Sequence, residues 1–112
     1  MRVLFSSTGN SWKSTLDGRF GRAKGFILYD EEKDTFSWHT NEDNRNTAHG
    51  AGTQAAQFAI NSGASVLITG HIGPKAFDIL KLSDIGVFNS SEESLKKVYE
   101  DYKQGKLKQQ LQ

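Results

Sequence analysis

The chain has 112 residues, among which there are no cysteines, one proline and one methionine. The absence of thiols excludes disulfides, and it also excludes the thiolate ligands of ordinary iron–sulfur clusters and of cysteine-based zinc sites. At this length the chain can bury one hydrophobic core, so we expect a single domain over residues 1–112.

The chain also lacks an excess of charge of either sign. The 14 Lys and Arg residues nearly balance the 13 Asp and Glu residues, which gives a formal net charge of +1. This balance offers no electrostatic case for a nucleic-acid or membrane partner. The longest apolar runs fall far short of the roughly 18 residues that a membrane span needs. Residues 1–6 are typical of a strand and too short for a signal peptide, so we expect a cytoplasmic protein.

Apolar runs and alternation predict five strands, and helical periodicity with small-residue stops predicts three helices. The predicted strands cover residues 3–5, 26–29, 35–39, 65–69 and 85–88. The predicted helices cover residues 51–62, 74–80 and 95–104, and Ser90 with Glu93 has the spacing of a capping box before the last one. We expect residues 106–112 to form a polar tail that frays.

The resulting order of elements is β-β-β-α-β-α-β-α. Alternating strands and helices in the second half predict parallel pairing through right-handed crossovers, whereas the early strands form an antiparallel hairpin. We therefore expect a three-layer α/β domain with a mixed five-stranded sheet, and this order suggests the ribonuclease H-like architecture. A nuclease on that fold needs clustered acids at the strand ends, where this chain has Ser6 and Thr69.

The turn from Thr69 to Pro74 is the most informative local pattern. A buried strand ends at Thr69, two glycines follow, and a helix begins at the only proline. Such a turn directs backbone N–H groups and the positive end of a helix dipole toward one place. His71 lies inside the turn, so we expect an anion or a metal-containing ligand here.

Other donors are expected at the same rim, because ligands of open α/β sheets bind beyond the carboxyl ends of the parallel strands. There is no carboxylate pair among them, which favours the binding of an anion over acid–base catalysis. Of these residues, His71 and His49 are also candidate metal ligands, because imidazole commonly binds metals. The candidate binding residues are Ser7, Asn10, Arg19, Arg22, His49, Gly70, His71 and Gly73.

Each candidate also has a purely structural interpretation. The glycines can serve as turn residues, the arginines can pair with Asp17 and Asp30, and the histidines can bond to the backbone or pack. His39 lies in the predicted hairpin, far from the rim, and is interpreted as structural. Trp12 lies in a polar loop and either packs over the core or faces a ligand. The segment 9–15 resembles a phosphate-binding loop but lacks the glycine before its lysine, which argues against nucleotide hydrolysis.

Several segments, in the right order, resemble the dinitrogenase iron–molybdenum cofactor biosynthesis family. The likeness is carried by Gly-Arg-Phe-Gly-Arg-Ala at residues 18–23, Phe-Ile-Leu-Tyr-Asp at 26–30, and His-Gly-Ala-Gly at 49–52. It continues in Thr-Gly-His-Ile-Gly-Pro-Lys-Ala-Phe at 69–77, Ile-Gly-Val at 85–87, and Tyr-Lys-Gln-Gly-Lys-Leu at 102–107. The resemblance thus covers nearly the whole chain.

The resemblance implies a small ribonuclease H-like protein that binds or carries a metal–sulfur cluster without being an enzyme. Relatives tied to nitrogenase assembly hold the iron–molybdenum cofactor or its precursor, and the orange protein holds a molybdenum–copper sulfide cluster non-covalently. A preassembled anionic cluster brings its own sulfide, which suits a protein without cysteine. We therefore expect a monomeric carrier of a molybdenum- or iron-containing sulfide cluster.

Two other functions stay open at this point. The chain could be an interaction or regulatory domain that binds a protein partner, such as a cluster-assembly ATPase, and no metal. Alternatively, a small phosphorylated or nucleotide ligand could occupy the same helix terminus.

Overall fold

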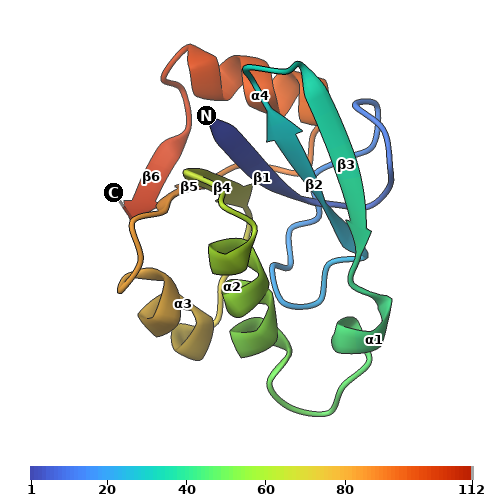
Figure 1. Ribbon diagram of the computed structural model, residues 1–112, viewed down its shortest axis with the longest axis vertical. Coiled ribbons are helices and arrows are strands. Elements are labelled where there is room, and N and C mark those ends of the chain that lie inside the picture. Colours follow the sequence, from blue (N-terminus) through green and yellow to red (C-terminus); the bar gives the residue numbers. More distant parts are fainter. Residues whose placement is uncertain (112) are drawn as a thin grey trace.

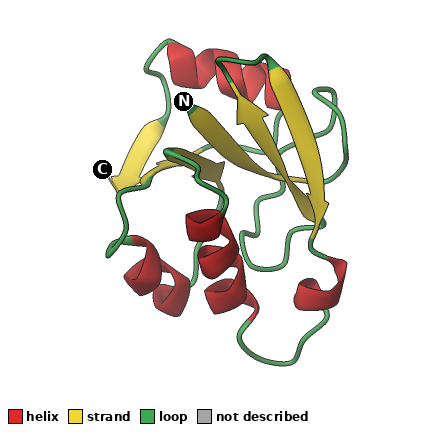
Figure 2. Cartoon of the chain, in the orientation of Figure 1, coloured by secondary structure: helices red, strands yellow, loops and turns green. Residues whose placement is uncertain are grey.

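The computed structural model describes residues 1–111, and within them the chain forms one mixed sheet with helices on both faces (Figure 1 and Figure 2). In chain order the elements are β1 (Arg2–Ser7), β2 (Gly25–Asp30), β3 (Thr35–Thr40), α1 (Glu42–Arg45), α2 (Ala51–Asn61), β4 (Val66–Thr69), α3 (Pro74–Leu80), β5 (Gly86–Asn89), α4 (Leu95–Lys103) and β6 (Lys108–Leu111). None of the helices in this described part has the length and apolar character needed to cross a membrane.

The sheet has the strand order β3-β2-β1-β4-β5-β6 within residues 1–111. Strand β1 is parallel to β4, and β4 is parallel to β5, as the crossover helices require. The pairs β1–β2 and β2–β3 are antiparallel, which confirms the predicted hairpin. The predicted mixed α/β class is therefore confirmed, with the parallel strands at the centre of the sheet.

The sheet has six strands rather than the predicted five. The segment expected to fray instead forms β6 over Lys108–Leu111, which pairs antiparallel with β5; Gln112 lies outside the described residues. This edge strand could not be predicted from the sequence, because its residues Lys-Gln-Gln-Leu show no apolar alternation. The side chain of Leu111 packs against the core, and backbone pairing with β5 provides the remaining stabilisation.

Two apolar cores lie on opposite faces of the sheet. On the face covered by α2 and α3, Leu4 and Leu67 are fully buried against alanines of α2. On the face covered by α4, the alternate strand residues Phe5 and Ile68 pack against Leu95. Because the central strands are covered on both faces, every residue of β4 is buried, which explains why its sequence does not alternate.

The helix termini differ in part from the predictions. Helix α3 begins at Pro74 as expected. The predicted capping box of Ser90 and Glu93 is wrong, because Ser94 caps α4 by accepting a hydrogen bond from the Lys97 N–H at 3.4 Å. The one-turn helix α1 lies in a segment predicted as loop, since its four residues are too few to show helical periodicity.

Candidate functional site

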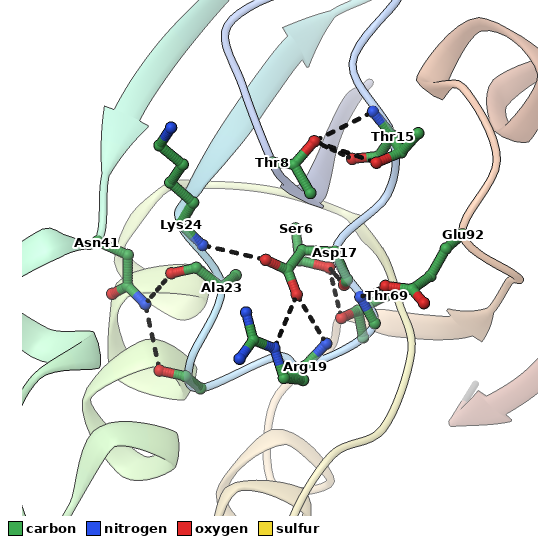
Figure 3. Close-up of polar contacts among 12 residues, drawn as sticks. Ser6, Thr8, Thr15, Asp17, Arg19, Ala23, Lys24, Asn41, Thr69 and Glu92 are labelled. Carbon is green, nitrogen blue, oxygen red and sulfur yellow. Dashed lines mark hydrogen bonds and ion pairs between the residues drawn. The ribbon is translucent and has the colours of Figure 1, made fainter.

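The loop between β1 and β2 is shaped by a buried carboxylate, Asp17, whose side chain is central in Figure 3. Its Oδ1 accepts a hydrogen bond from the Arg19 N–H at 3.1 Å, and its Oδ2 accepts one from the Lys24 N–H at 3.2 Å. The Arg19 side chain also lies 3.4 Å from Oδ1, although it is 64% exposed. Asp17 therefore closes residues 17–24 into a fixed loop that presents Arg19 to solvent.

Asn41 ties this loop to the segment that leads into α2. Its Nδ2 donates to the carbonyl oxygens of Gly21 at 3.2 Å and Ala23 at 2.9 Å, as Figure 3 shows. Its Oδ1 accepts from Asn44 Nδ2 at 3.0 Å. The sequence does not indicate that Asn41 links these two segments, because an asparagine that opens a polar loop is common and signals only a turn.

The glycine turn after β4 is paired with the same loop. The His71 N–H donates to the Gly18 carbonyl at 2.8 Å, and the Phe20 N–H donates to the His71 carbonyl at 3.1 Å. Arg19 and His71 are thereby bridged as parallel neighbours. Gly70 is required for this approach, because a Cβ there would lie 2.5 Å from the Gly18 oxygen. The structure thus places two predicted site residues side by side.

Arg22 has a role that the sequence did not indicate. Its Nη1 donates to the carbonyl oxygens of Arg45 at 2.7 Å and Thr47 at 2.8 Å. The predicted structural alternative of pairing with Asp30 is wrong, since the nearest cation to that carboxylate is Arg2, at 3.7 Å. Arg22 therefore holds the segment before α2 in place while its remaining guanidinium N–H groups stay available.

These segments enclose a cleft of about 470 Å³ at the carboxyl ends of β1 and β4. Five of the eight predicted binding residues line it, and no aspartate or glutamate is among its lining residues. A separate hollow, in contrast, is lined by Glu42 and Asp43. The polar groups lining the cleft are therefore mostly hydrogen-bond donors. The lining includes Arg19, Arg22, His49, His71 and Gly73, together with Gly21, Gly50 and Gly52.

The first turn of α2 supplies backbone donors to this cleft. Gly50 precedes the helix in the left-handed conformation, with φ of 81°, and contributes no side-chain cap. Within residues 1–111, the N–H groups of Ala51 and Gly52 have no protein acceptor. Gly21 packs directly on this turn, because a Cβ there would lie 2.7 Å from the Gly52 Cα. Uncapped N–H groups at the start of an 11-residue helix favour a negatively charged ligand.

Three predicted site residues do not line the cleft. Ser7 is fully buried, and its hydroxyl donates to the Gly9 carbonyl at 2.6 Å. Asn10 belongs to a loop that turns the other way, since the Lys96 N–H of α4 donates to the Trp12 carbonyl. Gly70 is buried and is required for the close approach to the Gly18 carbonyl. These three residues therefore lie outside the lining of the cleft, because a shared sheet edge does not fix the direction in which each loop leaves it.

Trp12 packs over the core and also lines a separate hollow, and His39 lies in the hairpin as predicted. Trp12 packs in an aromatic cluster on the α4 face, with ring centroids 5.0 Å from Tyr29 and 5.8 Å from Phe5. His39 lies in β3, where its Nε2 is 2.8 Å from the Ser37 hydroxyl. Neither side chain lines the cleft.

The cleft offers few metal ligands of its own. Within residues 1–111 there is no group of three or more His, Cys, Asp or Glu side chains that could hold a metal ion. His49 and His71 both line the cleft and are both exposed. A bare metal ion would lack a full set of protein ligands here, whereas a cluster with its own sulfides needs only hydrogen bonds and one or two imidazoles.

The fold and the donor-lined cleft define a small α/β protein with a site suited to an anion. The chain belongs to the dinitrogenase iron–molybdenum cofactor family, whose model matches residues 1–105. The family resemblance inferred from the sequence is therefore confirmed.

The chain is similar to several individual proteins over most of its length. It is 33% identical to the orange protein of Desulfovibrio gigas, solved in its apo form, with a TM-score of 0.90 over 96% of this chain and 91% of that one. Protein TM1290 of Thermotoga is 29% identical, with a TM-score of 0.80 and coverage of 96% and 91%. An uncharacterized protein of Methanocaldococcus jannaschii is 31% identical over 94 residues, which cover 82% of this chain and 80% of the relative.

Proposed function

We propose that this protein is a non-enzymatic carrier that binds a preassembled, anionic metal–sulfur cluster non-covalently in the cleft. The cluster would be of the iron–molybdenum cofactor type or a molybdenum–copper sulfide. The observation that carries the proposal is the cleft lining, which combines guanidinium, imidazole and backbone N–H donors with no carboxylate. Membership of the cofactor family supports the same class of ligand.

The donors have distinct roles in this proposal. The exposed guanidinium of Arg19 and the N–H groups at the start of α2 donate to sulfide ligands and stabilise their negative charge. His71 and His49 each offer an imidazole nitrogen that can bind a metal with an open coordination position. Arg22 fixes the wall of the cleft through two backbone carbonyls. No carboxylate lines the cleft, which supports the binding of an anion.

Because the chain has no cysteine, any cluster that it binds must bring its own sulfur. The chain has no thiolate with which to assemble a cluster, so the sulfide must arrive with the metal. A cluster that brings its own sulfide can be released without breaking a metal–thiolate bond to the protein. This property suits transfer or storage, and we propose that the carrier acts as a cytoplasmic monomer with the ribonuclease H-like fold.

The proposal is tested by anaerobic reconstitution. The protein is incubated with tetrathiomolybdate and copper(I), or with tetrathiomolybdate and iron(II), and is then desalted. The expected result is a charge-transfer absorption band that co-elutes with the protein at a fixed metal-to-protein ratio. A protein that stays colourless under all these conditions would overturn the proposal.

The sequence also suggested a metal-free domain that binds a cluster-assembly ATPase. The same reconstitution separates the two functions, because the interaction domain predicts no retained metal. A carrier must also hand over its cargo, so an ATPase partner is compatible with the carrier as well and does not by itself distinguish them.

A further inference from the structure

Gly73 is a glycine that neither the backbone nor the packing requires. Its φ of −68° and ψ of 162° are extended values that any residue adopts, and they are the values favoured before a proline. A Cβ built at Gly73 meets no atom within 4 Å. Gly70 and Gly21, in contrast, are fixed by close backbone contacts, and Gly50 by its positive φ. The missing side chain at Gly73 therefore leaves space for something other than protein.

That space joins two hollows. Gly73 lines the donor cleft and also a second hollow of about 320 Å³, and Gly50 and Gly52 line both as well. The boundary between the two hollows is thus made of three residues without side chains. A side chain at Gly73 would stand at their junction.

The second hollow has one charged lining residue, Lys75. Lys75 is exposed and has no ion-pair partner within residues 1–111. Lys81, on the other end of α3, is paired with Asp78 at 3.5 Å. The hydroxyl of Thr53, also in the second hollow, is already used, since it donates to the Gly50 carbonyl at 2.9 Å. Lys75 is therefore the feature of this hollow best suited to an anion.

We propose that the two hollows form one trough and that the ligand is an elongated anion which occupies both, passing Gly73 and ending at Lys75. This inference rests on the proposed function and specifies the shape of the ligand. A compact anion with a single metal fits within the first hollow, which Gly73 also lines, and is indifferent to Lys75. An anion with two or more metals bridged by sulfide extends past the junction and is sensitive to both.

The experiment compares two probes on five proteins. The probes are tetrathiomolybdate alone, which is compact, and the sulfide-bridged product of tetrathiomolybdate with copper(I). The proteins are the wild type, Gly73→Ala, Gly73→Leu, Lys75→Gln and, as a matched control on the same helix, Lys81→Gln. Dissociation constants are measured by anaerobic absorbance titration, and folding is checked by thermal melts.

The expected results differ between the probes. Gly73→Leu weakens binding of the copper-bridged probe by about tenfold or more through steric exclusion, and Gly73→Ala weakens it less. Lys75→Gln weakens the same probe by about threefold, as befits an exposed charge, and Lys81→Gln leaves it unchanged. Tetrathiomolybdate alone binds Lys75→Gln and Lys81→Gln within about twofold of the wild type, and Gly73→Leu weakens it less than the copper-bridged probe, because Gly73 also lines the first hollow. Both Gly73 variants stay folded and melt within a few degrees of the wild type, because a more restricted unfolded chain and a poorer N-cap of α3 act in opposite directions.

Wild-type affinity of Gly73→Leu and Lys75→Gln for the copper-bridged probe would overturn the trough, and the proposed function would stand. Equal weakening of both probes by Gly73→Leu and Lys75→Gln would also overturn the trough, because the copper-bridged probe would then reach no further than the compact one. Unfolding of Gly73→Ala would contradict the claim that the structure does not need this glycine. A wild type that binds neither probe would overturn the proposed function and the trough together.

Discussion

The α4 face of the sheet and the cleft on the α2–α3 face differ in how far their polar groups are satisfied within the protein. On the α4 face, charged groups neutralise one another: Lys97 lies 2.8 Å from Asp101, and Lys103 lies 3.1 Å from Glu31. The phenol of Tyr99 donates to Glu31 on the same face. On the α2–α3 face, the exposed side chains of His49, His71 and Lys75 have no hydrogen-bond or ion-pair partner in residues 1–111.

This difference separates stability from binding. Groups that satisfy one another contribute to folding and have little left to offer a ligand, whereas unsatisfied donors contribute to binding at little benefit to the fold. Substitutions on the α4 face should therefore lower stability and leave ligand retention intact. Substitutions of residues that line the cleft should weaken ligand retention and leave stability largely unchanged.

The largest expected effect is on the α4 face. Replacement of Trp12 by alanine removes a ring that contacts Phe5, Tyr29, Phe36 and Tyr99, and should lower the free energy of unfolding by about 3 kcal/mol. Chemical denaturation measures the loss, and Trp12→Phe should recover part of it. At a temperature where the variant is folded, its retention of the reconstituted cluster should equal that of the wild type. A loss of retention would place Trp12 in the binding site instead.

The next largest effect is expected at the cleft, where a substitution should weaken binding rather than stability. His71→Ala should weaken cluster retention by about tenfold through the loss of one metal bond or charge-assisted hydrogen bond, with little change in the melting temperature. Equilibrium dialysis of the reconstituted protein measures it. His39→Ala is the matched control, since His39 lies in β3 outside the cleft. Equal retention by both histidine variants would argue against a ligand at His71.

Arg22 tests whether the cleft wall must be held in place. Arg22→Ala removes both hydrogen bonds to the carbonyls of Arg45 and Thr47, which should cost about 1 kcal/mol locally. Amide hydrogen exchange of residues 45–50 should accelerate by several-fold, and retention should fall by less than in His71→Ala. Arg45→Ala is the control, because it keeps the backbone carbonyl that Arg22 binds. Unchanged exchange in Arg22→Ala would show that the segment is held by other contacts.

The smallest effect is a pH dependence on the α4 face. Burial by itself raises the pKa of Glu31, but hydrogen bonds from Tyr99 and Lys103 outweigh it and hold the pKa below the ordinary 4.5. Because the folded value lies below the unfolded one, Glu31 stabilises the fold above about pH 4.5, and this contribution is lost as the pH falls through the folded value. Glu31→Gln should remove that part of the acid sensitivity, less than about 1 kcal/mol in denaturant titrations. An identical acid profile in the variant would contradict this assignment.

The sequence was sufficient for the class of fold because its signals are strong where strands are buried. The continuous apolar run before Thr69 and the proline at residue 74 predicted β4 and the start of α3 correctly. The edge strand β6 could not be predicted, because its pairing depends on the backbone of β5 and leaves no pattern in Lys-Gln-Gln-Leu.

The candidate site could be predicted only as far as loop positions follow from topology. Arg19 and His71 were expected at one rim, and backbone pairing between their loops places them side by side. Ser7 and Asn10 lie outside the lining of the cleft, and the loop after β1 docks on α4 through contacts between residues about 80 positions apart that no local pattern reports. The roles of Asn41 and Arg22 depend on contacts with backbone carbonyls, which any polar side chain in a loop could make.

The central claim, that the ligand site is the glycine-lined cleft on the α2–α3 face, is tested most directly by a ¹H–¹⁵N NMR titration of the wild-type protein. The probe is tetrathiomolybdate with copper(I), and glycine amides resolve well enough to serve as reporters. We expect the largest shift changes at the amides of Gly21, Gly50, Gly52 and Gly73, with the Trp12 indole and Gly105 unmoved. Shift changes centred on Trp12 and α4, with the cleft glycines unmoved, would contradict it.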